Sequence, residues 1–299
     1  MPSSTFRPLV FLFTVLAVNS LGAGQSTPQF KWETKGFSSP ESVAYDAQRD
    51  CFYVSNLATR GKDRTPGDGF ISKVSRAGKI VKLKWATGLE DPKGLAVANG
   101  RLYVGDTPAM FEIDLETGNV LARHAPEDGG TGAFNDCTAD PQGNVYVYSS
   151  RLSTVYRLHA GNFEAWKEID TNVTGGLNGL RAETDRLLLG GWTIKDSNGD
   201  QQLGHISTVR FADRKVSRIG HTPVAHVDGL EPDGAGGYTV TDWPDGDVKH
   251  VDANGNVSTL MTLVKGTADH EYLIEDGLMI IPSMLEDRIR AYRWAPELP

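Results

Sequence analysis

Four polar residues, each at the head of an apolar run, carry the clearest chemistry in this sequence. They are Glu41, Asn135, Asn178 and Asp228, and they provide two carboxylates and two amides. Carboxylate and amide oxygens are the ligands that hard divalent cations prefer, so the set matches Ca²⁺ best. Mg²⁺, Mn²⁺ and Zn²⁺ are the alternatives. Zinc is the least natural of these, because no Cys or His opens these runs except near His270.

The four residues hold the same place in a repeated unit. Each copy has an apolar run opened by a small or polar residue, then a turn and a second strand-like run. Six copies are present, and they open at Glu41, Lys93, Asn135, Asn178, Asp228 and Asp269. Successive openings lie about 40 to 50 residues apart, which is the repeat length of a four-stranded propeller blade.

The repeat predicts an all-β fold, a six-bladed β-propeller of four-stranded antiparallel blades in one domain over residues 25–299. Each copy leaves room for two further strands, and the turns contain the Gly and Asn that tight hairpins need. A pair of β-sandwiches is the alternative, but it would not explain six copies in phase. Cys51 and Cys137 fall in different copies, which favours two buried thiols over a disulfide.

The two ends of the chain complement each other. The last copy has DRIRAYRW at residues 287–294 as its third strand and then lacks a fourth. The segment KWETKG at residues 31–36 stands, relative to Glu41, where the fourth strand KLKWATG stands relative to Lys93. We therefore predict that the N-terminal strand closes the ring, which removes two exposed sheet edges.

The first strand of each blade lines the central channel of a propeller, so the six opening residues are expected to meet at one mouth. For any single position an ordinary turn is the alternative, because Asn-Gly and Asp-Gly pairs favour local backbone bonding. Four oxygen donors in one repeat phase favour a cation site instead, since converging carboxylates without a counter-ion would be costly. Lys93 and His270 are candidate substrate contacts, with a solvated Lys and a packed His as the alternatives.

The N-terminal segment indicates where the protein is located, and the net charge limits which partners it can bind. Residues 1–24 join one Arg to a short apolar stretch and small residues, which predicts a removed export signal and a periplasmic or secreted protein, with an uncleaved anchor as the alternative. A net charge of -8 without a basic block disfavours nucleic acid and, after signal removal, membrane partners. A monomer that binds a small molecule is expected.

The chain resembles the senescence marker protein/gluconolactonase/regucalcin-like propellers, and paraoxonase more distantly. Four segments carry the resemblance: PESVAYD at 40–46, FNDCTADPQGNVYV at 134–147, LNGLRAETDRLLLG at 177–190 and VDGLEPDGAGGYTV at 227–240. The resemblance implies metal ligation by Glu41, Asn178 and Asp228. It places a second family Asn, which contacts metal or substrate, at Asn135. It makes Asp228 the candidate base, with a purely metal-ligating role as the alternative.

Two departures bear on the substrate. Related sugar lactonases often have an Arg two residues before the Asn of the F-N-D motif, where this chain has Ala133, and the His pair of paraoxonase has no clear match. The resemblance implies an exported metal-dependent lactone or ester hydrolase. The alternative, favoured by Ala133, is a non-catalytic propeller that binds a small ligand or protein and holds a structural Ca²⁺. The segment DSNGDQQLG at 196–204 departs from a calcium loop and predicts an Asn-Gly hairpin.

Overall fold

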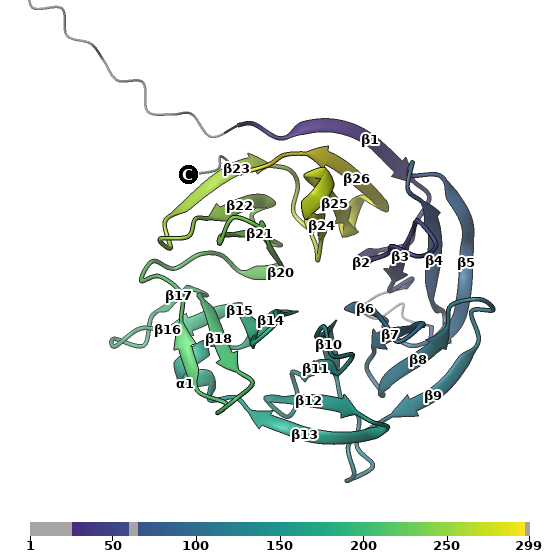
Figure 1. The fold of residues 1–299 in the computed structure, drawn as a ribbon, viewed down its shortest axis with the longest axis horizontal. Coiled ribbons are helices and arrows are strands. Elements are labelled where there is room, and N and C mark those ends of the chain that lie inside the picture. Colours follow the sequence, from purple (N-terminus) through teal and green to yellow (C-terminus); the bar gives the residue numbers. More distant parts are fainter. Residues whose placement is uncertain (1–25, 60–64, 297–299) are drawn as a thin grey trace, which may run out of the picture.

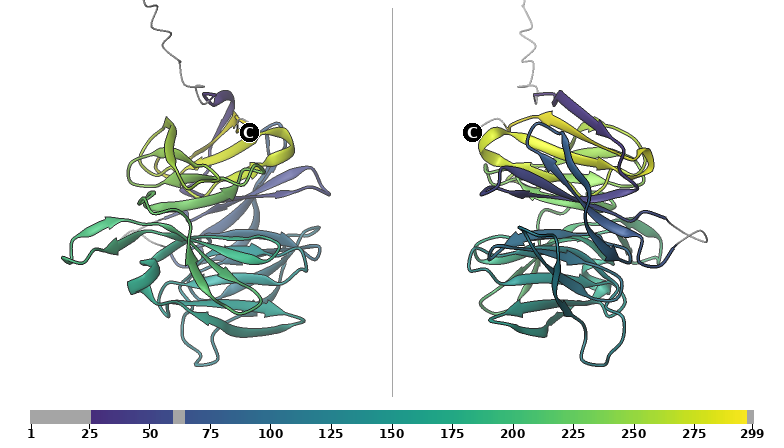
Figure 2. Two further views of the ribbon diagram at one scale, coloured as in Figure 1. Left: turned by 60° about the vertical axis from the view of Figure 1, so that its left-hand side comes forward. Right: turned by 90° about the vertical axis from the view of Figure 1, so that its right-hand side faces the viewer.

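Six four-stranded antiparallel sheets surround a central channel in the computed structural model, which describes residues 26–59 and 65–296 (Figure 1). Seen from the rim, the sheets lie face against face around the ring (Figure 2). The predicted six-bladed β-propeller is confirmed. The predicted signal at residues 1–24 lies outside the described residues. No helix in the described part of the chain is long and apolar enough to cross a membrane.

The strands fall into four positions per blade, from the channel to the rim. The innermost strands are β2 (Pro40–Asp46), β6 (Leu95–Ala98), β10 (Phe134–Ala139), β14 (Leu177–Ala182), β20 (Val227–Pro232) and β24 (Glu271–Leu273). The second strands are β3 (Cys51–Asn56), β7 (Arg101–Gly105), β11 (Val145–Ser149), β15 (Arg186–Gly191), β21 (Tyr238–Asp242) and β25 (Leu278–Ser283). The third strands are β4 (Gly69–Ser75), β8 (Met110–Asp114), β12 (Thr154–His159), β18 (Ile206–Arg210), β22 (Asp247–Val251) and β26 (Arg288–Arg293).

The outermost strands are the more solvent-exposed members of each blade. They are β5 (Ile80–Leu89), β9 (Val120–His124), β13 (Asn162–Glu168), β19 (Val216–Arg218), β23 (Val257–Thr262) and β1 (Gln29–Lys35). The second strands are buried on both faces and are accordingly rich in β-branched and aromatic residues, as in VYVYS of β11. Burial therefore falls from the second strand to the rim, and the polar edge of each blade faces water.

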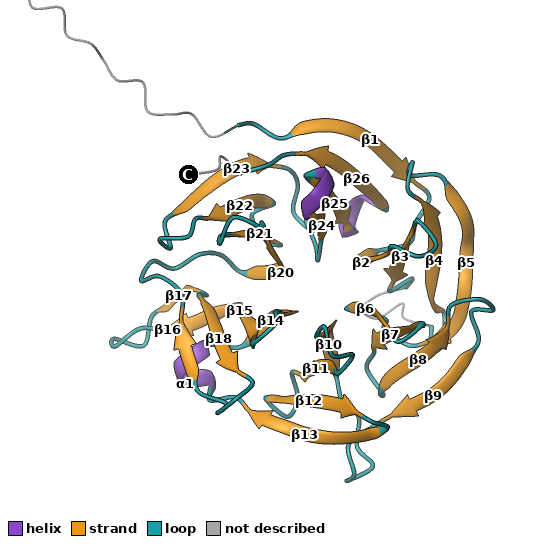
Figure 3. Ribbon diagram, in the orientation of Figure 1, coloured by secondary structure: helices purple, strands orange, loops and turns teal. Residues whose placement is uncertain are grey.

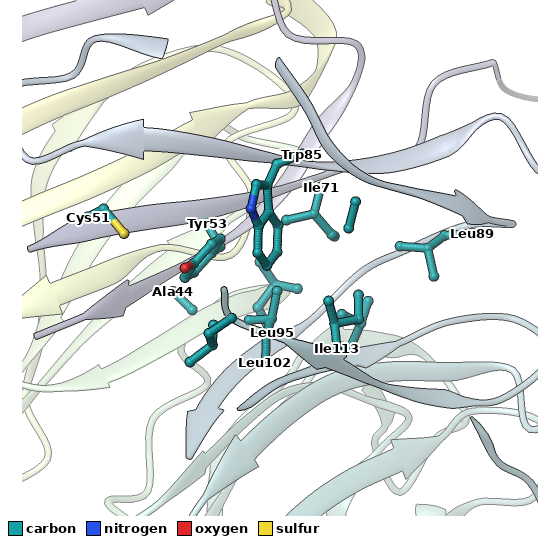
Figure 4. Packing of buried hydrophobic residues seen from close by; sticks show 12 residues of the cluster. Ala44, Cys51, Tyr53, Ile71, Trp85, Leu89, Leu95, Leu102 and Ile113 are labelled. Carbon is teal, nitrogen blue, oxygen red and sulfur yellow. The ribbon is translucent and has the colours of Figure 1, made fainter. Parts of the chain in front are cut away.

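The core consists of apolar clusters that lie between neighbouring blades. In one of them Tyr53 and Trp85 of the first blade pack with Leu95 and Ile113 of the second (Figure 4). Cys51 belongs to the same cluster, and both cysteines are buried and free. This packing fixes each blade against the next and so fixes where the inner strands meet.

The ring closes as predicted. Strand β1 pairs antiparallel with β26, from Gln29 opposite Arg293 to Lys35 opposite Arg288. The carboxylate of Glu33 accepts hydrogen bonds from Arg288 at 2.9 Å and Arg290 at 3.1 Å. The last blade thus takes its outer strand from the opposite end of the chain.

The fourth blade carries an addition that the other blades lack among the described residues. Between β15 and β18 the chain forms a two-stranded hairpin, β16 (Thr193–Lys195) and β17 (Gln201–Leu203). The hairpin predicted from DSNGDQQLG is thus present. A short helix, α1 (Thr171–Thr174), lies beside it (Figure 3). Two 3₁₀ turns in the last blade, η2 (Ile274–Asp276) and η3 (Met284–Glu286), complete the elements.

Candidate active site

The four predicted ligands lie at irregularities of the inner strands. Where β2 pairs with β3, the register shifts between Pro40 and Val43, across Glu41. The pairings of β10, β14 and β20 shift in the same way across Asn135, Asn178 and Asp228. Strands β6 and β24 pair without a shift. A bulge breaks the alternation of a strand and redirects its side chains, so local irregularity sets the orientation of these four residues.

The glycines that follow the opening residues allow close approach between strands. Gly179 and Gly229 do not have positive φ, so they are not there to form left-handed turns. A Cβ on Gly179 would lie 2.8 Å from the carbonyl oxygen of Asp228. A Cβ on Gly229 would lie 2.6 Å from the backbone nitrogen of His270. The Asn-Gly and Asp-Gly pairs are therefore contacts between adjacent inner strands around the channel, and the turn interpretation is wrong for them.

Three of the predicted ligands have a buried oxygen without a hydrogen-bond partner. These atoms are Glu41 Oε2, Asn135 Oδ1 and Asn178 Oδ1. The fourth ligand, Asp228, is 2% exposed, and its Oδ1 accepts a hydrogen bond from Asn178 Nδ2 at 2.5 Å. An unpartnered buried oxygen costs about 1–3 kcal/mol, and a cation between such atoms would offset that cost. The donor set therefore fits a hard divalent cation.

The charges at the mouth are poorly compensated by the protein. Burial raises the pKa of Glu41 well above its usual range, and the carboxylate of Asp228 raises it further. The pKa of Asp228 is also raised well above normal, first by burial and then by Asp269. The ammonium group of Lys93 opposes both shifts. Lys93 thus lies close enough to the mouth to act on its charges.

Two further carboxylates belong to the same cluster. Asp136 Oδ2 accepts a hydrogen bond from the Leu180 backbone at 3.0 Å, while its Oδ1 is buried without a partner. Burial raises the Asp136 pKa well above its usual range, and Asp269 adds to the rise. Asp269 accepts from Ser42 Oγ at 2.6 Å, and burial raises its pKa to about 7. Asp269 raises the pKa of Asp228, and Asp228 in turn raises the pKa of Asp136, so the three carboxylates lie close together.

His270 is enclosed by protein. It is 1% exposed, and its Nε2 lies 2.8 Å from Thr239 Oγ1. Burial, aided by the charge of Arg181, lowers the His270 pKa to about 3, so the ring is neutral near pH 7. Contact of His270 or Lys93 with substrate stays a prediction. Ala133, which replaces the Arg of related lactonases, lies in the loop before β10 with φ of 44°.

The opposite end of the channel has a different charge arrangement. There Arg181 Nη1 lies 2.9 Å from Glu231 Oε1, and Arg181 Nη2 lies 3.9 Å from Glu271 Oε1. Glu271 Oε2 also accepts from the Tyr45 backbone at 2.9 Å. Arg181, Glu271 and Tyr45 line a cavity of about 180 Å³ with Thr138. The carboxylates at this end are paired with a protein cation, although Glu231 Oε2 is buried without a hydrogen-bond partner.

A third acidic grouping lies beside the start of β20. His226, Asp242 and Asp245 each place a potential ligand atom within 4.8 Å of the others. Asp242 Oδ2, however, accepts from the His226 backbone at 3.3 Å and lies 3.6 Å from Lys249 Nζ. Since a lysine already compensates this carboxylate, the grouping is a poorer cation site than the mouth.

Comparisons with known proteins agree with the fold. No protein-family model matches the chain, and no curated protein matches it. A gluconolactonase from Xanthomonas campestris is 14% identical, with a TM-score of 0.66 over 90% of this chain and 95% of its own. The fold is that of a gluconolactonase-like propeller.

Two other solved structures share this fold. A Bacteroides thetaiotaomicron protein of unknown function is 13% identical, with a TM-score of 0.65 over 90% of this chain and 75% of its own. An inactive variant of virginiamycin B lyase from Staphylococcus aureus, solved with quinupristin, is 13% identical, with a TM-score of 0.56 over 89% of this chain and 99% of its own. At these identities the similarity concerns the fold alone.

Proposed function

We propose that the chain is a metal-dependent hydrolase of lactones or related esters, with one divalent cation, preferably Ca²⁺, at the channel mouth. Glu41, Asn135, Asn178 and Asp228 would hold this cation. The observation that carries the proposal is the set of buried, unpartnered oxygens at the bulges of three inner strands. The fold shared with a gluconolactonase supports the choice of a lactone as substrate.

The reaction needs an activated water and a proton acceptor. A divalent cation, when bound, polarises a substrate carbonyl and makes water more acidic. Asp228 accepts the proton from the attacking water, and the water oxygen adds to the carbonyl carbon. The ring C–O bond then breaks, and the leaving oxygen takes up the proton that Asp228 holds. The hydrogen bond from Asn178 Nδ2 orients the Asp228 carboxylate for this role.

The part of the substrate that reacts at the mouth is small and uncharged or weakly polar. Ala133 supplies no cation for an anionic group, and the chain carries a net charge of -8. Anionic sugar acids are therefore poorer substrates than neutral lactones.

The proposal is tested by calorimetric titration of Ca²⁺ combined with a panel of neutral lactones and esters, with and without chelator. Hydrolysis that chelator removes and Ca²⁺ restores is the expected result. Equal Ca²⁺ affinity in the wild-type protein and in Asp228→Ala would rule out this site. Bound metal without turnover of any panel member would instead favour the second class, a non-catalytic propeller with a structural cation.

Location and partners are part of the same proposal. With residues 1–24 removed, the protein would work outside the cytoplasm as a monomer on a small molecule, without nucleic acid or membrane partners. The composition of the N-terminus and the acidic net charge support this. Cell fractionation with N-terminal sequencing, and light scattering of the purified protein, test it. A protein retained in the cytoplasm with residues 1–24 intact would contradict it.

A further inference from the structure

A second cavity opens between the third and fourth blades. Its volume is about 630 Å³, within the roughly 300–1,000 Å³ of typical small-molecule sites. Its walls come from the end of β11, from α1, from the start of β14 and from the β16–β17 hairpin. We call this cavity the hairpin groove, because the hairpin forms one of its walls.

The lining of the hairpin groove includes residues that are close along the strands to two predicted ligands. Leu177 lines the groove and directly precedes Asn178. Tyr148, another lining residue, is adjacent to Ser149, which pairs with Phe134, the neighbour of Asn135. The Tyr148 side chain is almost fully buried, and its hydroxyl interacts with the Leu177 backbone and with Ser153. The groove and two predicted ligands thus draw on neighbouring strand positions, which would let one molecule extend from the groove toward the mouth.

The chemistry of the walls selects the kind of molecule. Hydroxyl and amide side chains predominate, among them Ser150, Thr171, Asn172, Thr193 and Gln201. The charged lining residues are one Lys and one Asp, Lys195 and Asp196, so the groove is neutral overall. An acyl chain would leave the hydroxyls and amides desolvated without partners. An anionic group would need clustered cations.

We propose that the hairpin groove binds a neutral, hydroxyl-rich unit, a glycosyl residue attached to the lactone or ester that is hydrolysed at the mouth. This inference rests on the proposed function and extends it, because it makes the preferred substrate larger than one lactone ring. Ile194 and Leu177 supply apolar surface for the C–H face of a sugar ring, and the hydroxyl and amide groups supply its hydrogen bonds. The hairpin provides the specificity.

Two variants test the groove, one by filling it and one by removing a single polar side chain. Gly176 lines it, has no positive φ, and a Cβ placed on it meets nothing within 4 Å. Gly176→Phe therefore fills the groove without backbone strain. Gln201→Ala removes one side-chain amide, and Gln48→Ala is its control, because Gln48 is an exposed glutamine in the turn after β2 that does not line the groove.

The assay compares kcat/KM for glucono-1,5-lactone with kcat/KM for lactobionolactone, which carries an added galactosyl unit. The wild-type protein is expected to prefer the larger substrate at least tenfold, and Gly176→Phe is expected to abolish the preference. Gln201→Ala should reduce it about two- to tenfold, as expected for one hydrogen bond, while Gln48→Ala keeps it. Thermal melting of each variant confirms that it is folded.

Calorimetric titration of lactose into chelator-treated protein separates the two proposals, because this binding needs neither metal nor turnover. Turnover of the small lactone with no preference and no lactose binding overturns the groove and leaves the hydrolase standing. Lactose binding that Gly176→Phe removes, without turnover of either lactone, supports the groove and overturns the hydrolase. If the protein neither binds lactose nor hydrolyses either lactone, the groove proposal and the hydrolase proposal are both overturned.

Discussion

The central channel buries carboxylates at both ends, but their charges are compensated in different ways. At the far end Arg181 pairs with Glu231 at 2.9 Å, and Glu271 accepts a backbone hydrogen bond. At the mouth the oxygens of Glu41, Asn135 and Asn178 have no partner. Glu231 and Asp228 even belong to the same strand, β20. The difference between the two ends is therefore the ion pair and not burial, because Glu231 also has a buried oxygen without a hydrogen-bond partner, Oε2, while its other oxygen pairs with Arg181.

The largest effect should come from exchanging carboxylate for amide within β20. Asp228→Asn is expected to lower kcat about 10²- to 10⁴-fold at saturating Ca²⁺, because an amide can ligate a cation but cannot accept a proton. Glu231→Gln, three residues further along the same strand, should keep kcat close to wild type. Steady-state assays on a neutral lactone, with Ca²⁺ titration of each variant, measure this. Full activity in Asp228→Asn would move the base to Asp136 or Asp269.

Removing the positive charge at the far end of the channel should lower the stability of the fold. Arg181→Met leaves Glu231 and Glu271 buried without their cation, which should lower the free energy of unfolding by about 1–3 kcal/mol. The loss stays below that of a fully buried ion pair because the Arg181 side chain is 36% exposed. Denaturant melts with Arg123→Met as the surface control measure it. An unchanged melt would mean that Arg181 does not stabilise the two glutamates.

The metal-free protein should lose stability as the pH rises. The folded-state pKa of Asp269, about 7, lies above its ordinary value of 3.8, so the folded state holds a proton that the unfolded state has released. The unfolded state is thus increasingly favoured between about pH 4 and pH 7. In chelator, the melting temperature should fall between pH 5.5 and 7.5, and less steeply in Asp269→Asn. Saturating Ca²⁺ should reduce the fall. Identical slopes in wild type and Asp269→Asn would contradict this.

The smallest effect concerns Lys93. Its positive charge opposes the pKa shifts of Glu41 and Asp228, so it also repels a cation held by them. Lys93→Met should tighten Ca²⁺ binding about three- to tenfold, corresponding to about 1 kcal/mol. Calorimetric titration at two salt concentrations measures the change, which should shrink at high salt. Weaker binding in the variant would show that Lys93 supports the site.

The repeat made the blades predictable. The six openings share a phase, and KWETKG repeats the fourth-strand pattern, so both the ring and its closure by β1 followed from the sequence. The four oxygen donors could be named for the same reason. The bulges at these donors could not be predicted, because a register shift depends on the partner strand.

No sequence pattern indicated the ion pair at the far end of the channel. Arg181 and Glu231 lie inside their strands, 50 residues apart, where a charged side chain looks like any outward-facing residue in the alternation. Only the curvature of the ring brings them together. The hairpin at 193–203 was predicted as a hairpin, yet its role as a wall of a cavity depends on α1 and β11, which are distant in sequence.

Ring closure by β1 has a consequence for how the protein folds. The ion pair between Glu33 and Arg288 joins residues 255 positions apart, and non-local pairing of this kind slows folding because loop-closure entropy must be overcome first. Until β26 has formed, the nascent ring has two open sheet edges, on β1 and on the last blade, that can pair with other chains. A molecule of this design is therefore most vulnerable to aggregation late in its synthesis, and most in need of chaperones at that stage.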